Sequence, residues 1–148
     1  MCEVCKTHVL ETAKHCGACN RCTSGFDHHC RWLNNCIGER NYHLFFKLIV
    51  AVFVMALVHN ITNCFTLYLF FTGNDQVGQQ HELFFAKVLH VEFAWSLTVA
   101  VIFNLITALF LGQLIIFHLM LQKKGMTTFE YIRWKEDRRT ASKIVVKI

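Results

Sequence analysis

The sequence predicts a mainly α-helical membrane protein, in which a small cysteine-rich domain with little regular structure precedes two transmembrane helices. Of its 148 residues, 54% are apolar, 14% are aromatic and none is proline. Seven of its eight cysteines lie between Cys2 and Cys36, whereas nearly all of its fourteen phenylalanines follow that segment. The charged fraction of 17% argues against a disordered chain and, despite the net charge of +5, against a nucleic-acid-binding domain.

Two segments are long enough and apolar enough to cross a bilayer as helices. Residues 48–71 and 93–121 contain 24 and 29 consecutive residues without Lys, Arg, Asp or Glu, and a bilayer core needs about 20. Neither segment has the alternation of a strand or the narrow apolar stripe of a soluble helix. The alternative is a pair of buried helices in a soluble bundle, which is disfavoured because uncharged runs of this length are rare in small soluble proteins.

The charges outside these segments predict the orientation of the chain in the membrane. Residues 1–47 carry six basic and four acidic residues, the loop of residues 72–92 has a net charge of −2, and the tail of residues 122–148 has one of +5. Because Lys and Arg beside a span favour the cytoplasm, both termini are expected in the cytosol and the loop in the lumen or outside the cell. We expect an integral protein of an endomembrane (Golgi or endoplasmic reticulum) or of the plasma membrane, with membrane lipid as a partner.

Six polar side chains interrupt the two spans, and we expect them to face other helices. They are His59, Asn60, Asn63, Asn104, Gln113 and His118. Hydrogen bonding between helices is favoured over a substrate path as their role. Because two helices alone satisfy such groups poorly, further helices or another chain are expected to complete the bundle.

The cysteine cluster has the spacing of a metal site. It reads C-x2-C, then H-C-x2-C-x2-C, then D-H-H-C and a final C, between Cys2 and Cys36. A CxxC turn separates two thiolates by about one edge of a zinc tetrahedron, and sets of three cysteines and one histidine are common structural zinc sites. Cytosolic cysteines favour metal binding or catalysis. The alternative is a disulfide-rich ectodomain, which predicts no zinc and a lumenal N-terminus.

Two closed zinc sites need eight ligands, and the segment offers eight in two ways. Seven cysteines with His15 give eight but leave out the His28-His29 pair. Six cysteines with two histidines also give eight, and leave one cysteine free beside a histidine. Spacing alone does not identify the free cysteine. Since few large apolar side chains lie between Met1 and Arg31, zinc is expected to supply the folding free energy, about 10 kcal/mol per site in peptide models.

This segment resembles the DHHC cysteine-rich domain of protein S-acyltransferases (palmitoyltransferases). The resemblance rests on the pattern C-x2-C-x9-H-C-x2-C-x2-C-x4-D-H-H-C-x5-C-x4-N-x3-F, which runs from Cys2 to Phe45. A second match is Thr127-Thr128-Phe129-Glu130, which fits the TTxE motif that follows a membrane helix in this family. Three positions depart from the family's usual Pro, Arg and Pro, and none is a proposed ligand or catalytic group: they are Leu10, Thr12 and Arg31.

The resemblance implies two interleaved structural zinc sites and one reactive cysteine. The first zinc would be bound by Cys2, Cys5, His15 and Cys22, and the second by Cys16, Cys19, His29 and Cys36. Cys30 would be the acylated nucleophile, with His28 as its general base and Asp27 to orient His28. Trp32 would lie near the thioester of the acyl donor at the membrane face, and the structural supports of the site would be Asn41, Thr127 and Thr128.

The resemblance implies a protein S-palmitoyltransferase that acts in two steps through an acyl-enzyme on Cys30. The acyl donor would be acyl-CoA, such as palmitoyl-CoA, and the acceptors would be cysteines of protein substrates at the cytosolic membrane face. Members of the family normally have two further helices before the cysteine-rich domain, so the present spans would be the third and fourth. The alternative is therefore a truncated, inactive membrane-anchored zinc module that acts as a scaffold or regulatory partner. For Cys30 itself, the alternative role is that of a ligand in a purely structural zinc module.

Overall fold

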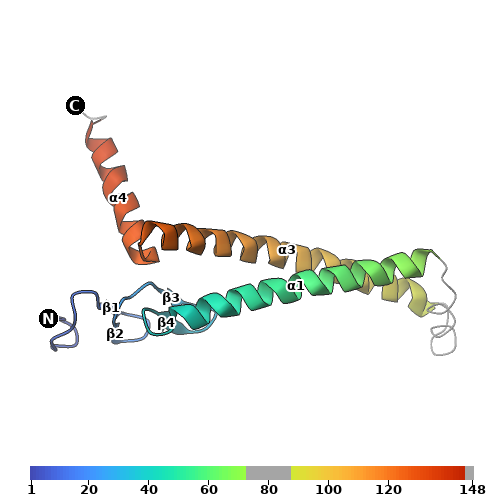
Figure 1. The fold of residues 1–148 in the computed structure, drawn as a ribbon, viewed down its shortest axis with the longest axis horizontal. Helices are drawn as coiled ribbons and strands as arrows, with labels where there is room; N and C mark the ends of the chain where they lie inside the picture. The colour runs from blue at the N-terminus through green and yellow to red at the C-terminus, as the bar shows by residue number, and fades with distance from the viewer. Residues whose placement is uncertain (73–87, 146–148) are drawn as a thin grey trace. The chain divides into compact units, whose positions relative to one another are not determined.

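The computed structural model describes the backbone of residues 1–72 and 88–145. The elements follow in the order β1 (Lys14–Cys16), β2 (Arg21–Thr23), β3 (His28–Cys30), β4 (Asn35–Ile37), α1 (Tyr42–Phe71), α3 (Val88–Lys124) and α4 (Thr128–Val145) (Figure 1). They form two compact units, of which the first comprises Met1–Leu48 with Ile115–Ile148 and the second Ile49–Leu114. The predicted fold class is confirmed: a cysteine- and histidine-rich region with short strands precedes two long apolar helices.

The cysteine-rich region consists of two small antiparallel hairpins. Strand β1 pairs with β2 and strand β3 pairs with β4, and every strand has three residues. The chain takes the left-handed conformation at Asn20, before β2, and at Asn34, before β4, with φ of 47° and 46°. Asparagine adopts this conformation more readily than most residues. An isolated hairpin of this size is marginally stable at best, which suits a segment that depends on metal binding.

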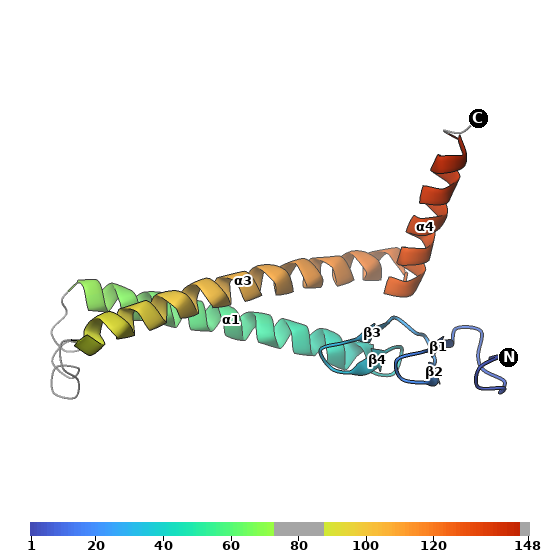
Figure 2. The ribbon, with the colours of Figure 1, turned by 180° about the vertical axis from the view of Figure 1, so that it is seen from behind.

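Helices α1 and α3 contain the two predicted spans. Tyr42–Phe71 and Glu92–Lys124 are long and apolar enough to cross a membrane, with mean hydropathies of 2.2 and 2.4. Within the second unit, the two helices lie side by side in both ribbon views (Figures 1 and 2). A Cβ added at Gly112 would lie 3.5 Å from the Phe53 ring, so the helices pack closely at this small residue. Of the predicted loop of residues 72–92, residues 73–87 lie outside the described residues.

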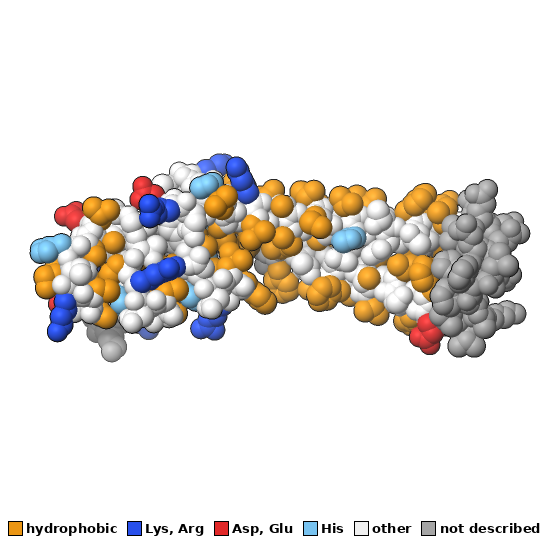
Figure 3. All heavy atoms as spheres, turned by 90° about the horizontal axis from the view of Figure 1, so that it is seen from below, with side chains coloured by type: hydrophobic (Ala, Val, Ile, Leu, Met, Phe, Trp, Pro, Cys, Tyr) orange, Lys and Arg blue, Asp and Glu red, His pale blue; other side chains and the backbone are white. Residues whose placement is uncertain are grey.

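The surface of these helices is apolar. On the face shown in Figure 3, most of the coloured side chains along the long helices are hydrophobic. Large exposed ones include Phe65, Ile61, Phe103, Phe110 and Ile116, each at least 60% exposed. A helix that is apolar on all sides is suited to lipid or to contact with further helices.

The polar residues of the spans follow two patterns. Asn60 and Asn104 donate from Nδ2 to the backbone oxygens of Ala56 and Ala100, within their own helices. Asn60 Oδ1 is buried, and within the described part of the chain it has no hydrogen-bond partner. By contrast, His118 of α3 lies within hydrogen-bond distance of the Tyr42 hydroxyl of α1. It therefore faces another helix, as predicted for these residues.

The segment after α3 forms a further helix, α4, whose start is explained by a capping box. The Thr127 hydroxyl accepts a 3.2 Å hydrogen bond from the Glu130 backbone N–H, and a Glu130 carboxylate oxygen accepts one of 2.8 Å from the Thr127 N–H. These bonds satisfy two backbone donors that the first turn of a helix leaves unpaired. Gly125, in the left-handed conformation with φ of 61°, ends α3.

Candidate functional site: two metal-binding groups beside a carboxylate–histidine pair

The hairpins bring the eight predicted zinc ligands into two groups of four. The first group is Cys2, Cys5, His15 and Cys22, and the second is Cys16, Cys19, His29 and Cys36. Within each group the ligand atoms all lie within 4.8 Å of one another. Each group thus has three thiols and one imidazole, the donor set of many structural zinc sites.

The separations between ligand atoms suit a tetrahedral ion. Zinc bonds of about 2.3 Å to sulfur and about 2.0 Å to nitrogen give tetrahedral edges of roughly 3.5–3.8 Å. In the first group, Cys22 Sγ lies 3.6 Å from Cys5 Sγ and 3.8 Å from His15 Nδ1. In the second, His29 Nδ1 lies 3.7 Å from Cys16 Sγ and 3.3 Å from Cys19 Sγ. The residues therefore fit a zinc ion in both groups.

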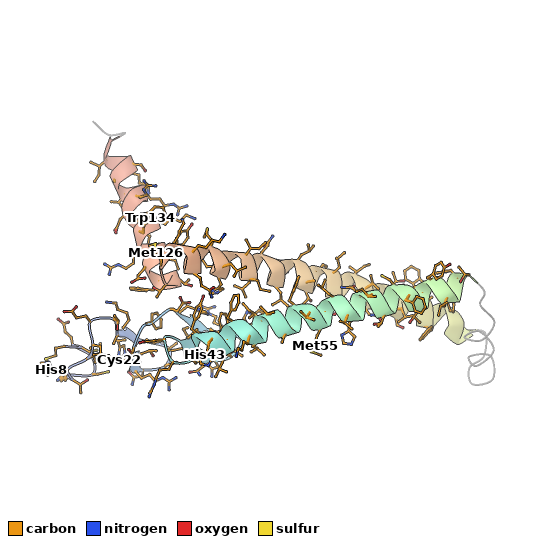
Figure 4. The ribbon with its side chains drawn as sticks, viewed as in Figure 1. His8, Cys22, His43, Met55, Met126 and Trp134 are labelled. Atoms are coloured by element: carbon orange, nitrogen blue, oxygen red, sulfur yellow. The ribbon has the colours of Figure 1, made fainter. Side chains whose placement is uncertain are left out.

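Strand pairing explains why each group forms. His15 pairs with Cys22 across β1 and β2, and His29 pairs with Cys36 across β3 and β4. Directly paired residues of an antiparallel ladder have their Cβ atoms about 5 Å apart on one face. Each hairpin therefore supplies a histidine and a cysteine that already point the same way. Cys22 is labelled among the side chains of this region in Figure 4.

Strand alternation also separates neighbouring residues between the two groups. Successive side chains of a strand point to opposite faces, so His15 and Cys16 of β1 can join different groups. The same alternation places His28 and Cys30 of β3 on one face and His29 on the other. His29 belongs to the second metal group, which leaves His28 and Cys30 together on the face away from it.

Crowding of the thiols makes a cation favourable in both groups. The pKa of Cys22 is raised to about 12 because its thiol hydrogen-bonds to Cys2 and to Cys5, with some loss of water contact. Burial and contacts with Cys19 and Cys16 raise the pKa of Cys36 to about 11. A bound metal ion stabilises the thiolate form of its cysteine ligands and so deprotonates them.

A carboxylate–histidine pair lies beside the second metal group. His28 Nδ1 donates a 2.6 Å hydrogen bond to Asp27 Oδ2. This bond fixes the proton on Nδ1, so Nε2 of a neutral His28 is free to accept a proton. Asp27 is 4% exposed, whereas a quarter of the His28 side chain is exposed. The pair combines a shielded carboxylate with an accessible imidazole.

Asp27 is held by the N-terminus of α4, 101 residues later in the chain. The Thr128 N–H donates to Asp27 Oδ1 and the Thr128 hydroxyl donates to Asp27 Oδ2, both at 2.8 Å. The Phe129 N–H donates to the backbone oxygen of Asp27 at 3.1 Å. Free N–H groups and the helix dipole make a helix N-terminus favourable for an anion. Burial alone would raise the pKa of Asp27, but the hydrogen bonds from His28 and Thr128 outweigh it and lower the pKa.

Cys30 and Trp32 occupy contrasting environments. Cys30 is 8% exposed and Trp32 is 98% exposed. In the part of the chain that the structure describes, no hydrogen bond joins Cys30 Sγ to the imidazole of His28 or to any other group. The structure thus brings Asp27 and His28 into contact and puts Cys30 on the same strand face as His28, without a bond between them.

Asn41 links the second hairpin to helix α1. Its Oδ1 accepts a 2.9 Å hydrogen bond from the Gly38 N–H, and its Nδ2 donates a 3.0 Å bond to the backbone oxygen of Cys36. Gly38 itself packs tightly, because an added Cβ would lie 2.7 Å from the Ser24 backbone oxygen. Asn41, which directly precedes α1, therefore connects the start of that helix to the backbone of β4, the strand that carries the metal ligand Cys36.

Two side chains near His28 were not predicted as part of the site. Phe45 packs edge-on against the His28 ring at 5.1 Å between centroids, and the His118 ring lies 5.9 Å from it. Phe45 was the last position of the sequence pattern but had no assigned role. His118 was recognised only as a polar residue within a span. A polar side chain in an apolar helix is the one sequence signal that could have indicated His118.

Comparison with known proteins finds matches over most of the chain. The family model of DHHC palmitoyltransferases matches residues 1–135. The chain is 34% identical over 137 residues to probable protein S-acyltransferase 20 of Arabidopsis thaliana, covering 88% of this chain and 19% of that protein. It is 36% identical over 146 residues to probable palmitoyltransferase ZDHHC11B of Homo sapiens, covering 88% of this chain and 39% of that protein.

A third relative is protein S-acyltransferase 8 of Arabidopsis thaliana, with 30% identity over 136 residues, 92% of this chain and 31% of that protein. The chain thus spans between about a fifth and two fifths of the length of these relatives. The matched residues include both metal-binding groups, the Asp27–His28 pair and the start of α4. The chain therefore belongs to the DHHC palmitoyltransferase family.

Proposed function

We propose that this chain carries the acyl-transfer site of a protein S-acyltransferase, with Cys30 as nucleophile, His28 as general base and Asp27 as the residue that orients His28. The observation that carries the proposal is the 2.6 Å hydrogen bond from His28 Nδ1 to a buried carboxylate, beside a cysteine on the same strand face. Membership of the family and the printed names of the relatives, each an S-acyltransferase or palmitoyltransferase, support the same reaction.

The first step forms an acyl-enzyme from acyl-CoA. His28 Nε2 accepts the proton of the Cys30 thiol as the sulfur attacks the thioester carbonyl, and Asp27 stabilises the imidazolium that results. The bond between the carbonyl carbon and the CoA sulfur then breaks. His28 returns its proton to the departing CoA sulfur, so free CoA leaves and the acyl group remains on Cys30 as a thioester.

The second step transfers the acyl group to a cysteine of a protein substrate. The acceptor thiol gives its proton to His28 Nε2 and attacks the carbonyl carbon of the Cys30 thioester. The bond to Cys30 breaks, and the Cys30 sulfur recovers the proton. One imidazole serves as base and then acid in both steps. Because a thioester is exchanged for a thioester each time, the reaction needs no oxidant or separate energy source.

The two metal-binding groups have a supporting role in this proposal. Zinc, when bound, would supply folding free energy to a segment whose strands have three residues each. Both groups already contain four protein ligands, as closed structural sites do. The ligand His29 lies between His28 and Cys30 in β3, so a filled second site would fix the strand that carries both reacting side chains.

The membrane would present both substrates at this site. We place the termini on the cytosolic side of an endomembrane or of the plasma membrane, with the acyl chain of palmitoyl-CoA in the bilayer and CoA in water. Trp32, which is 98% exposed, would meet the thioester region, since tryptophan favours the membrane interface. The exposed apolar surface of α1 and α3 is available for contact with further helices or another chain, which would complete an acyl pocket.

Acylation by a labelled donor tests the proposal. The full chain, purified in detergent with zinc, is incubated with radiolabelled palmitoyl-CoA, and label released by neutral hydroxylamine is counted as thioester. We expect label on the wild type and none on a Cys30→Ser variant that retains the zinc content of the wild type. No label on a fully metallated wild type would favour the alternative of a scaffold without turnover. A fall in zinc content of Cys30→Ser would identify Cys30 as a metal ligand instead.

A further inference from the structure

Two polar or charged side chains are buried among the described residues, and the proposed mechanism uses only one of them. Asp27 is 4% exposed and His118, near the end of α3, is 2% exposed. The Tyr42 hydroxyl, at the start of α1, lies 3.0 Å from His118 Nδ1. Burial of an imidazole costs free energy unless it is hydrogen-bonded. An apolar side chain would fill this place at lower cost, so a buried histidine here indicates a further role.

His118 and Phe45 enclose the ring of His28. The centroid of the His28 ring lies 5.1 Å from that of Phe45 and 5.9 Å from that of His118, and the Phe45 and His118 centroids are 5.2 Å apart. Each of the three rings therefore contacts the other two. In both ribbon views the end of α3, the start of α1 and strand β3, which all belong to the first unit, lie together (Figures 1 and 2).

A histidine held by a single hydrogen bond needs such an enclosure to act as a base. The second side-chain torsion of histidine has a broad energy well, so the Asp27 bond fixes one ring nitrogen but leaves the ring free to tilt. A general base must stay within hydrogen-bond distance of the proton that it takes. Displacement of a reacting group by about 1 Å can lower a rate about 100-fold.

We propose that Tyr42 and His118 are positioning residues for His28. The hydrogen bond between them fixes the plane of the His118 ring, and that ring, with Phe45, holds the His28 imidazole with Nδ1 on Asp27 and Nε2 toward the face that carries Cys30. Helices α1 and α3 thereby set the orientation of the base on β3. This role rests on the proposed acyl transfer, and it adds two residues that do not touch the reacting atoms.

Variants that keep the ring but remove the hydrogen bond test the proposal. Tyr42→Phe, His118→Phe and the double variant are compared with His59→Phe, a matched control at an exposed histidine of α1. The initial rate of Cys30 acylation is measured against palmitoyl-CoA concentration, with zinc content as the check on folding. We expect the maximal rate to fall about 10- to 100-fold at an unchanged half-saturating concentration. The double variant should lose no more than His118→Phe, and the control should keep the wild-type rate.

A second measurement separates this proposal from the acyl transfer on which it rests. In ¹⁵N-histidine-labelled protein, the His28 signals, assigned by a His28→Asn variant, report which ring nitrogen carries the proton. Tyr42→Phe and His118→Phe should shift these signals toward a mixture of tautomers, and His59→Phe should not. If the wild type is not acylated but the shifts occur, acyl transfer is wrong and the positioning stands. Unchanged His28 signals and wild-type acylation rates in metallated Tyr42→Phe and His118→Phe would overturn the positioning role.

Discussion

The Asp27 carboxylate accepts three hydrogen bonds at the proposed site. Its two carboxylate oxygens accept hydrogen bonds from His28 and from the backbone and hydroxyl of Thr128. These bonds outweigh burial and keep the pKa of Asp27 low. The carboxylate therefore stays ionised at the near-neutral pH of the proposed acyl transfer, and it can stabilise a positive charge on His28. The Asp27 side chain thus connects the start of α4 to His28, the general base of the proposed reaction.

Removal of the Thr128 hydroxyl is expected to raise the pKa of Asp27 and to slow acylation. In Thr128→Val the carboxylate remains buried but loses a donor worth about 1.5–3 kcal/mol, so its pKa moves up. Because the folded pKa lies below the usual value of about 3.9, the contribution of Asp27 to stability is complete above that pH and is lost as the pH falls through the folded pKa. Carboxyl ¹³C NMR titration measures the shift.

Thr127→Val is the matched control for this substitution. Thr127 caps α4 and does not bond to Asp27, so its replacement should cost about 1 kcal/mol of unfolding free energy and leave the Asp27 titration unchanged. Equal Asp27 titrations in the two variants would contradict the assigned partners.

Spacing indicated two metal sites and the family resemblance indicated which residues would fill them, but the contacts of these residues could not be predicted. CxxC pairs and nearby histidines limit the ligand sets because few arrangements satisfy two tetrahedral ions. The contact between His118 and Tyr42 joins residues 76 apart, and that between Thr128 and Asp27 joins residues 101 apart. A local sequence pattern does not show which residues so far apart along the chain come into contact. The pattern of Thr127 and Glu130 is itself a capping box, so the start of α4 was open to prediction.

At the scale of elements, two features explain the arrangement of the hairpins. Side chains alternate between the two faces of each strand, and the backbone packs closely at Gly38. In β3 the middle side chain, His29, points to one face and joins the metal group, whereas His28 and Cys30 point to the other face and serve the proposed chemistry. Gly38, after β4, brings that hairpin against the Ser24 backbone. The hairpins therefore combine metal ligands with close backbone packing at Gly38 and with the burial of Ile37 of β4.

Loss of one ligand is expected to lower zinc content and to destabilise the second hairpin. Cys36 pairs with His29 across β3 and β4, so Cys36→Ser removes one thiolate of a four-ligand group. Zinc measured by mass spectrometry should fall below two ions per chain, the number of metal-binding groups among the described residues. Cys64→Ser, at an exposed cysteine outside both groups, should keep the wild-type content. Equal zinc contents in the two variants would argue against the second site.

A methyl group at Gly38 should be costly, whereas one at Gly17 should be tolerated. A Cβ at Gly38 would lie 2.7 Å from the Ser24 oxygen, but a Cβ at Gly17 would meet no atom within 4 Å. Overpacking of this kind costs about 1–3 kcal/mol. Thermal unfolding of the metallated chain should therefore show a lower midpoint for Gly38→Ala and little change for Gly17→Ala. A tolerated Gly38→Ala would mean that the hairpin can shift away from Ser24.

At the scale of the whole molecule, the chain combines a metal-dependent segment with helices that suit a membrane. The uncharged runs predicted both helices because length and composition alone decide whether a helix can cross a bilayer. The polar residues within the helices were predicted to face other helices, and His118 does so. Asn60 instead bonds within α1 and leaves one buried oxygen without a partner among the described residues. Such an oxygen is suited to a donor from a further helix.

The central claim is that Cys30 carries the acyl group during turnover. Its most direct test is mass spectrometry of the zinc-loaded full chain after brief incubation with palmitoyl-CoA, followed by peptide mapping and then by addition of a cysteine-containing acceptor peptide. We predict one palmitoyl group per chain, located on Cys30, which disappears as the acceptor peptide becomes acylated. An acyl group found only on another cysteine, such as Cys64, or one on Cys30 that is never passed to an acceptor, would contradict the account.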